Sequence, residues 1–153
     1  MSGSEKAPAE KAAAEKPVPL TVEQLQERLM RAPYHRWLGL KAEEVGQGTV
    51  TIRATWREEW IVNPDRRYTH GGILAALVDL AADWALGAAL GRGLPTIDMR
   101  VDYHRVALPG DLVCKGRIVR QGGQFSVAEA EIYDLEGKLC ASGRGVYLTA
   151  APK

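Results

Sequence analysis

The most hydrophobic part of the chain follows a pair of glycines, in the stretch THGGILAALVDLAAD at residues 69 to 83. Apolar residues dominate every side of a helical projection from residue 73 to residue 90, which predicts a helix that is buried nearly all round. Two aspartates interrupt this run, Asp79 and Asp83. Because an unpaired buried carboxylate costs several kcal/mol or becomes neutral, both acids need an explanation.

Alternating apolar and polar residues predict strands on both sides of this helix. Before it, LKAEEVGQ and TVTIRATW are joined by a hairpin turn at residues 46 to 48. After it, TIDMRVDYH alternates cleanly and predicts a half-buried strand. Three more strands follow, DLVCKGRIVRQ, QFSVAEAEIYD and KLCASGRGVYLT, and the glycine-containing turns that separate the last four strands are short enough only for antiparallel neighbours.

The N-terminal region divides into a tail and a short helix. Residues 1 to 19 are rich in Ala, Glu, Lys and Pro and contain no apolar core of a signal peptide, which predicts a disordered tail. In TVEQLQERLMRAP, Thr21 and Gln24 have the spacing of a capping box, and Pro33 ends the predicted peripheral helix. Residues 20 to 153 then form one domain of the α+β class, in which an antiparallel sheet curves around the long helix.

Composition narrows the class of function. The chain has 153 residues, and its 20 basic and 19 acidic residues give a net charge of +1, which argues against broad electrostatic capture of nucleic acid or of a membrane surface. Two aspartates near the middle of the long apolar segment also argue against a membrane span. Cys114 and Cys140 lack the spacing of a zinc site or a disulfide framework, so reduced thiols and a cytoplasmic location are expected.

The motif His70-Gly71-Gly72, with Asp79 nine residues after the histidine, resembles the PaaI-like (phenylacetate-pathway) acyl-CoA thioesterases, which have the hot-dog fold. The similarity covers residues 35 to 149, including TIDMRVDYHRVALPGD and ASGRGVYL. It implies hydrolysis of an aromatic or medium-chain acyl-CoA to the free acid and CoA, without metal or cofactor. It also implies a homodimer that assembles into a homotetramer.

The residues of the motif suit this chemistry. The free N–H groups at a helix start suit a carbonyl oxygen that gains negative charge, so Gly71 N–H is the expected oxyanion donor, and Gly72 leaves room for the thioester. Asp79 is expected to act as a general base on water or as a nucleophile, although a buried acid satisfied by neighbouring donors is the structural alternative. Eight residues of helix separate Asp79 from Gly71 by about 12 Å, so the two can cooperate only across a dimer.

Several neighbouring residues carry two readings each. His70 positions the substrate carbonyl or caps the helix, and Thr96 is either the hydroxyl residue near the acid or an ordinary strand residue. Asn63 matches the family's asparagine in type but lies seven residues before His70 instead of six, so it holds the water or carbonyl, or caps a turn before Pro64. For Asp83 a structural role is favoured.

Coenzyme A phosphates require cations at the mouth of the site, and Arg105, Arg92 and Arg120 are the candidates. Four aromatic residues either line an acyl pocket or belong to the core: Trp56, Trp60, Tyr68 and Trp84. Two other functions compete with the thioesterase. A hot-dog acyl-CoA hydratase would need Asp and His within reach in one site, which fits the spacing of His70 and Asp79 less well, and a non-catalytic acyl-CoA binding module would not need the acid.

Overall fold

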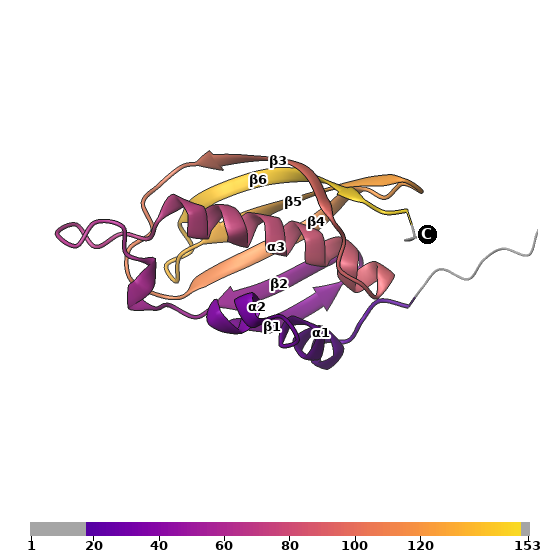
Figure 1. Ribbon diagram of the computed structural model, residues 1–153, viewed down its shortest axis with the longest axis horizontal. Coiled ribbons are helices and arrows are strands. Elements are labelled where there is room, and N and C mark those ends of the chain that lie inside the picture. Colours follow the sequence, from indigo (N-terminus) through magenta and orange to yellow (C-terminus); the bar gives the residue numbers. More distant parts are fainter. Residues whose placement is uncertain (1–17, 151–153) are drawn as a thin grey trace, which may run out of the picture.

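The computed structural model describes residues 18–150, and it shows one long helix cradled by a curved sheet (Figure 1). Three helices and one short 3₁₀ helix are present in this part of the chain: α1 (Val22–Leu29), α2 (Pro33–Trp37), η1 (Glu58–Trp60) and α3 (Gly71–Leu90). Six strands complete it: β1 (Leu40–Gly46), β2 (Thr49–Ala54), β3 (Thr96–Tyr103), β4 (Leu112–Arg120), β5 (Phe125–Tyr133) and β6 (Leu139–Leu148). The predicted tail lies almost entirely outside the described residues.

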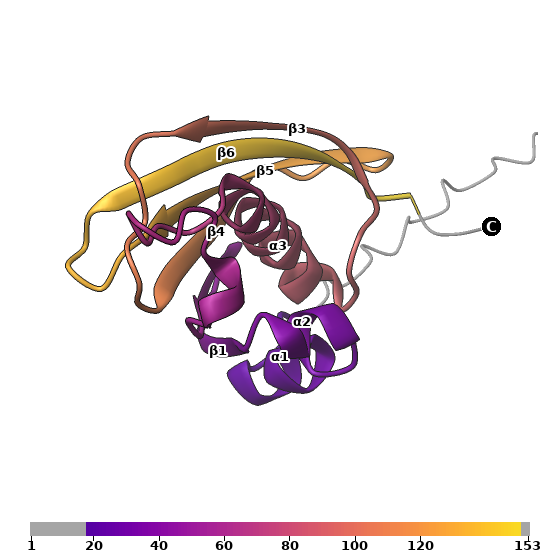
Figure 2. The same cartoon turned by 60° about the vertical axis from the view of Figure 1, so that its left-hand side comes forward.

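All neighbouring strands are antiparallel, in the order β1-β2-β4-β5-β6-β3. The sheet curls around α3, as the view turned by 60° makes clear (Figure 2). The expected architecture, a long central helix wrapped by an antiparallel sheet, is confirmed. Each hairpin turn predicted within β1–β2, β4–β5 and β5–β6 is also present.

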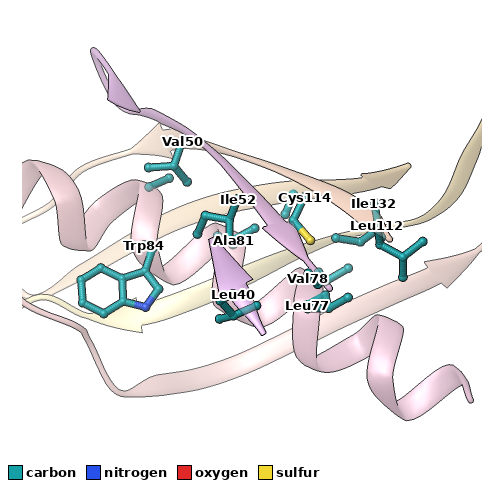
Figure 3. Close-up of a cluster of buried hydrophobic side chains, with 14 of the residues drawn as sticks. Leu40, Val50, Ile52, Leu77, Val78, Ala81, Trp84, Leu112, Cys114 and Ile132 are labelled. Carbon is teal, nitrogen blue, oxygen red and sulfur yellow. The ribbon is translucent and has the colours of Figure 1, made fainter. Parts of the chain in front are cut away.

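The core lies between α3 and the concave face of the sheet, where large apolar side chains from both layers interdigitate (Figure 3). Close approach of helix and sheet depends on small residues in the strands. A Cβ added at Gly116 would lie 1.9 Å from the carbonyl oxygen of Ala81, so only glycine fits there. Cys114 and Cys140 are buried free thiols.

The residues at the two ends of α3 determine where this helix begins and where it stops. His70 caps the start through its side chain, and Gly91 ends the helix with a left-handed φ of 74°, which glycine adopts without strain. Within residues 18–150, α3 is long and apolar enough to cross a membrane by length and composition, and more than half of its apolar window is buried inside the fold.

The N-terminal helices cover one end of the core. The capping box of Thr21 and Gln24 forms as predicted, and Leu25 and Leu29 are fully buried. The reading of Pro33 as a stop is incomplete, because Pro33 also begins α2. Proline fits the first position of a helix, where its missing N–H costs nothing.

The predicted neighbours of β3 were wrong. This strand pairs with β6 instead of β4, and it forms one edge of the sheet. Residues 104 to 111 carry the chain from β3 across the beginning of α3, since Thr69 N–H donates to the carbonyl oxygen of Ala107. The strand is also less buried than its alternation indicated: Met99 and Val101 pack on the core, but Ile97 and Tyr103 are 55% and 56% exposed.

Candidate active site

Asp79 lies on α3 opposite the start of β3, where two hydroxyl groups meet its carboxylate. Thr96 Oγ1 donates a hydrogen bond to Asp79 Oδ1 at 2.9 Å, and the Tyr147 hydroxyl donates to the same oxygen at 3.2 Å. Asp79 is partly buried, not fully enclosed as its apolar surroundings in the sequence indicated. Its contact with Thr96 agrees with the position that the family resemblance implied for a hydroxyl residue.

Asp83, one turn further along α3, is tied to the chain that leaves the helix. Its Oδ1 accepts the N–H of Leu94 at 2.8 Å. Burial raises the pKa of Asp83 to about 7, and the charge of Asp79 contributes to the rise, although the Leu94 hydrogen bond and Arg92 oppose it. Arg92 itself donates to the carbonyl oxygen of Thr149. These contacts give Asp83 and Arg92 a structural role at the end of the helix.

The start of α3 supplies a hydrogen-bond donor. His70 Nδ1 accepts the N–H of Gly72 at 2.7 Å, so this exposed side chain caps the helix start. The N–H of Ile73 donates to the carbonyl oxygen of His70. Among the described residues nothing accepts the N–H of Gly71, which leaves this group and the positive end of the helix dipole for an anionic oxygen.

A surface hollow of about 330 Å³ opens beside this helix start. It is lined by residues of the preceding loop, the helix, the end of β3 and the loop after β3: Tyr68, Thr69, Gly71, Leu74, Tyr103, His104, Arg105 and Val106. Any side chain at position 71 would press on the Tyr103 ring, because a Cβ there would lie 3.3 Å from it. The hollow therefore places Arg105, the predicted phosphate-binding residue, on the same surface as Gly71.

Asn63 is engaged in its own turn. Its Oδ1 accepts the N–H groups of Asp65 at 3.0 Å and Arg66 at 2.9 Å, and Arg67 completes the turn with a positive φ of 49°. This is the turn-capping arrangement that was one of its two readings. The structure shows no hydrogen bond from Asn63 to Asp79 or His70 within the described residues.

The predicted aromatic lining divides between core and surface. Trp60 and Trp84 are 0% and 6% exposed and belong to the core, whereas Tyr68 lines the hollow beside Gly71. Trp56 is partly buried and packs against Trp60 with ring centroids 6.1 Å apart. Residues 18–150 contain no cluster of three or more His, Cys, Asp and Glu side chains that could hold a metal ion.

A single chain does not bring its two functional groups together. Strand β3 connects them instead: Thr96 contacts Asp79 at one end, and the Tyr103 hydroxyl donates to the carbonyl oxygen of Gly71 at 3.1 Å at the other. The sequence reasoning did not single out Tyr103 or Tyr147 for the site. The sequence of β6 held one signal for Tyr147. Alternation places this tyrosine on the same face of the strand as Gly145, whose missing side chain leaves room for the tyrosine ring.

Comparison with known proteins identifies relatives across most of the chain. A family model described as "Thioesterase superfamily" matches residues 67–141. A protein of Halobacterium salinarum described as a candidate esterase is 34% identical over 122 residues, which are 72% of this chain and 80% of that protein. The medium/long-chain acyl-CoA thioesterase YigI of Escherichia coli is 25% identical over 131 residues, covering 76% of this chain and 84% of YigI.

Solved structures of other proteins show the same relationship at the level of the fold. A crystal structure of a thioesterase superfamily protein superimposes with a TM-score of 0.81 at 46% identity, over 83% of this chain and 96% of that chain. The Escherichia coli PaaI protein of the phenylacetic acid degradation operon superimposes with a TM-score of 0.71 at 21% identity, over 88% of this chain and 99% of PaaI. Because the identity is only 21%, this similarity to PaaI shows a shared fold alone.

Proposed function

The chain belongs to the thioesterase superfamily and is a thioester hydrolase, and on that premise we propose that it hydrolyses aromatic or medium-chain acyl-CoA to the free acid and CoA in the cytoplasm. In this reaction the oxygen of water adds to the thioester carbonyl carbon, the C–S bond breaks, and the CoA sulfur leaves with a proton. The name of the YigI relative supports the medium-chain part of the proposal.

The observation that carries this proposal is that two hydroxyl groups hold the Asp79 carboxylate, while the N–H of Gly71 at the start of α3 has no acceptor among the described residues. Asp79, held by Thr96 and Tyr147, can take a proton from water or attack the carbonyl carbon itself, and both routes require the ionised carboxylate. Gly71 N–H can donate to the carbonyl oxygen as its negative charge develops. Arg105, in the hollow beside Gly71, is placed to meet a CoA phosphate.

We infer that the enzyme is a homodimer built through β3. An edge strand leaves a row of backbone N–H and C=O groups without partners, which favours pairing with another strand. This edge also exposes apolar side chains, with Ile97 55% exposed and Val106 and Leu108 of the next loop 57% and 60% exposed. A second copy of β3 would cover both features, and further association of such dimers gives the homotetramer.

Two-fold pairing of β3 would also complete the active site. An antiparallel pair centred on the middle of the strand sets Thr96 opposite the partner's Tyr103. Because Thr96 contacts Asp79 and Tyr103 contacts Gly71, this arrangement brings Asp79 toward the partner's Gly71. Each dimer then contains two sites, and each site takes its acid from one subunit and its oxyanion donor from the other.

The first test removes the charge of the acid. Asp79→Asn should lower kcat by about 10²- to 10⁴-fold with the fold retained, because the amide can neither accept the proton nor attack the carbonyl. Asp83→Asn makes the same change one turn away and should keep kcat within about threefold, since a neutral residue at this position still accepts the Leu94 N–H. Normal turnover by Asp79→Asn would refute the assignment.

The second test combines two inactivating substitutions, one in each subunit of a heterodimer. Gly71→Val and Asp79→Asn homodimers should both be nearly inactive. In the heterodimer of the two variants, one site carries both lesions and the other carries neither, so about half of the wild-type activity per dimer should return. Heterodimers purified by two different tags that remain as inactive as their parents would show that acid and donor act within one chain.

A substrate panel distinguishes the competing functions. We expect release of free CoA from phenylacetyl-, hydroxybenzoyl- or medium-chain acyl-CoA, measured with a thiol reagent. Addition of water to a 2-enoyl-CoA without thiol release would instead identify a hydratase. Tight binding of all these thioesters without turnover would identify a binding module.

A further inference from the structure

The two oxygens of the Asp79 carboxylate have different surroundings. Both hydroxyl donors, Thr96 at 2.9 Å and Tyr147 at 3.2 Å, point to Oδ1. Oδ2 receives no hydrogen bond from any of the described residues 18–150. A carboxylate held by two donors on one oxygen has a fixed orientation, and its second oxygen is left to interact with something else.

The two donors come from paired strands. Thr96 on β3 and Tyr147 on β6 are direct partners in the sheet register. Thr96 is exposed at the edge, whereas Tyr147 is fully buried, so its hydroxyl has little freedom to move away. The Tyr147 oxygen also lies 3.3 Å from the carbonyl oxygen of Asp79, so its one proton is shared between the backbone and the side chain of the acid.

A glycine makes room for this tyrosine. Gly145 and Tyr147 lie on the same face of β6, and a Cβ added at Gly145 would be 2.5 Å from the Tyr147 hydroxyl and 2.7 Å from two ring carbons. The aromatic ring therefore lies across the bare backbone of Gly145. Any larger residue at position 145 would push the phenol away from Asp79.

The phenol remains a donor under all ordinary conditions. Burial raises the pKa of Tyr147 well above its usual range, and the charge of Asp79 raises it further. A neutral phenol can donate to an ionised carboxylate, and hydrogen bonds to a charged acceptor are about twice as strong as neutral ones. Tyr147 thus stabilises the form of Asp79 that the reaction needs.

We propose that Tyr147 is a positioning residue of the active site, which together with Thr96 fixes Asp79 Oδ1 so that Oδ2 is the oxygen that acts on water or on the thioester carbonyl. This inference rests on the proposed function of Asp79. Tyr147 works through the carboxylate and does not touch the substrate. Its removal leaves the acid in place but less well oriented.

The central variant is Tyr147→Phe, which removes one oxygen atom. We expect kcat to fall about tenfold with KM little changed, because the substrate contacts remain. We also expect the acidic limb of the pH profile of kcat to move to higher pH, because the ionised carboxylate loses a donor. Circular dichroism and Tm would establish that the variant is folded.

A matched control lies on the neighbouring strand. Tyr133→Phe removes a hydroxyl that donates to Glu131 at 2.7 Å, away from Asp79, and should leave kcat and the pH profile unchanged. Gly145→Ala tests the same contact in another way, since it keeps the hydroxyl but displaces the ring, and a folded variant should reproduce the shifted profile. If neither variant at Tyr147 or Gly145 folds, Thr96→Val decides, because it removes the second donor to Oδ1 at an exposed position.

The outcomes separate two kinds of failure. If Asp79→Asn is fully active, the proposed role of the acid is wrong. If Asp79→Asn is inactive but a folded Tyr147→Phe has an unchanged kcat and pH profile, the acid is right and the positioning role is wrong. A lower Tm with unchanged kinetics would show that Tyr147 only supports the fold.

Discussion

Replacing Asp83 with asparagine should stabilise the protein at neutral and alkaline pH. Asp83 is partly buried on α3, and among the described residues its carboxylate accepts a hydrogen bond from Leu94 N–H. Burial and the nearby Asp79 raise the pKa of its carboxyl from the ordinary value of 3.8 to about 7. The amide oxygen of asparagine can accept the same N–H, so the substitution removes the charge and retains the contact.

The magnitude follows from linkage between proton binding and folding. Between about pH 4 and pH 7 the unfolded chain has lost the Asp83 proton while the folded chain still holds it, so stability falls as pH rises. The loss is about 1.4 kcal/mol per pH unit, which gives about 4 kcal/mol over the whole window as an upper value, and no further loss above pH 7. The asparagine variant lacks this loss.

Urea unfolding at pH 5, 6, 7 and 8 would measure the effect, with ionic strength and protein concentration held constant. The difference in unfolding free energy between Asp83→Asn and wild type should grow by about 3 kcal/mol from pH 5 to pH 7 and then level off. Using the difference cancels titrations that the two proteins share. A difference that is constant with pH would refute the reasoning that the folded protein holds Asp83 in its protonated form.

Two further predictions concern packing and substrate binding. Gly116→Ala should lower the unfolding free energy by about 3 kcal/mol, because its Cβ would meet the Ala81 carbonyl; Gly123→Ala, with open space around its Cβ, should cost less than about 1 kcal/mol in the same urea titration. Arg105→Ala should raise KM for an acyl-CoA about fivefold with kcat nearly unchanged, and added salt should shrink the difference. An equal rise in KM for Arg120→Ala would show that the effect is not specific to the hollow beside Gly71.

Most of the fold could be predicted from the sequence because its signals are local. Alternation identified the strands, the continuous apolar run identified α3, and glycines marked the hairpin turns. The place of β3 beside β6 could not be predicted this way, since alternation shows which faces a strand has but not which strand it joins. The exposure of Ile97 and Tyr103 follows from this edge position and was missed for the same reason.

The candidate site was predictable where a motif carried it. The spacing of Gly71 and Asp79 led to the prediction that two chains are needed, which stays a prediction, and the resemblance pointed to Thr96, which contacts Asp79. Tyr147 belongs to no motif, because its role depends on a register between β3 and β6 that joins residues far apart in the sequence. Asn63 shows the opposite problem: its residue type matched the family, but its local hydrogen bonds are those of a turn.

Strand β3 constrains which insertions and deletions the gene can accept. Thr96 at its beginning contacts Asp79, and Tyr103 at its end contacts Gly71. Side chains of a strand alternate between faces, and Thr96 and Tyr103, seven residues apart, both face α3 because the register shifts by one residue between Thr96 and Asp98. One further added or lost residue would turn one of the two side chains to the opposite face. Related sequences should therefore keep the distance from Thr96 to Tyr103 constant and vary in length in the connection from residue 104 to residue 111.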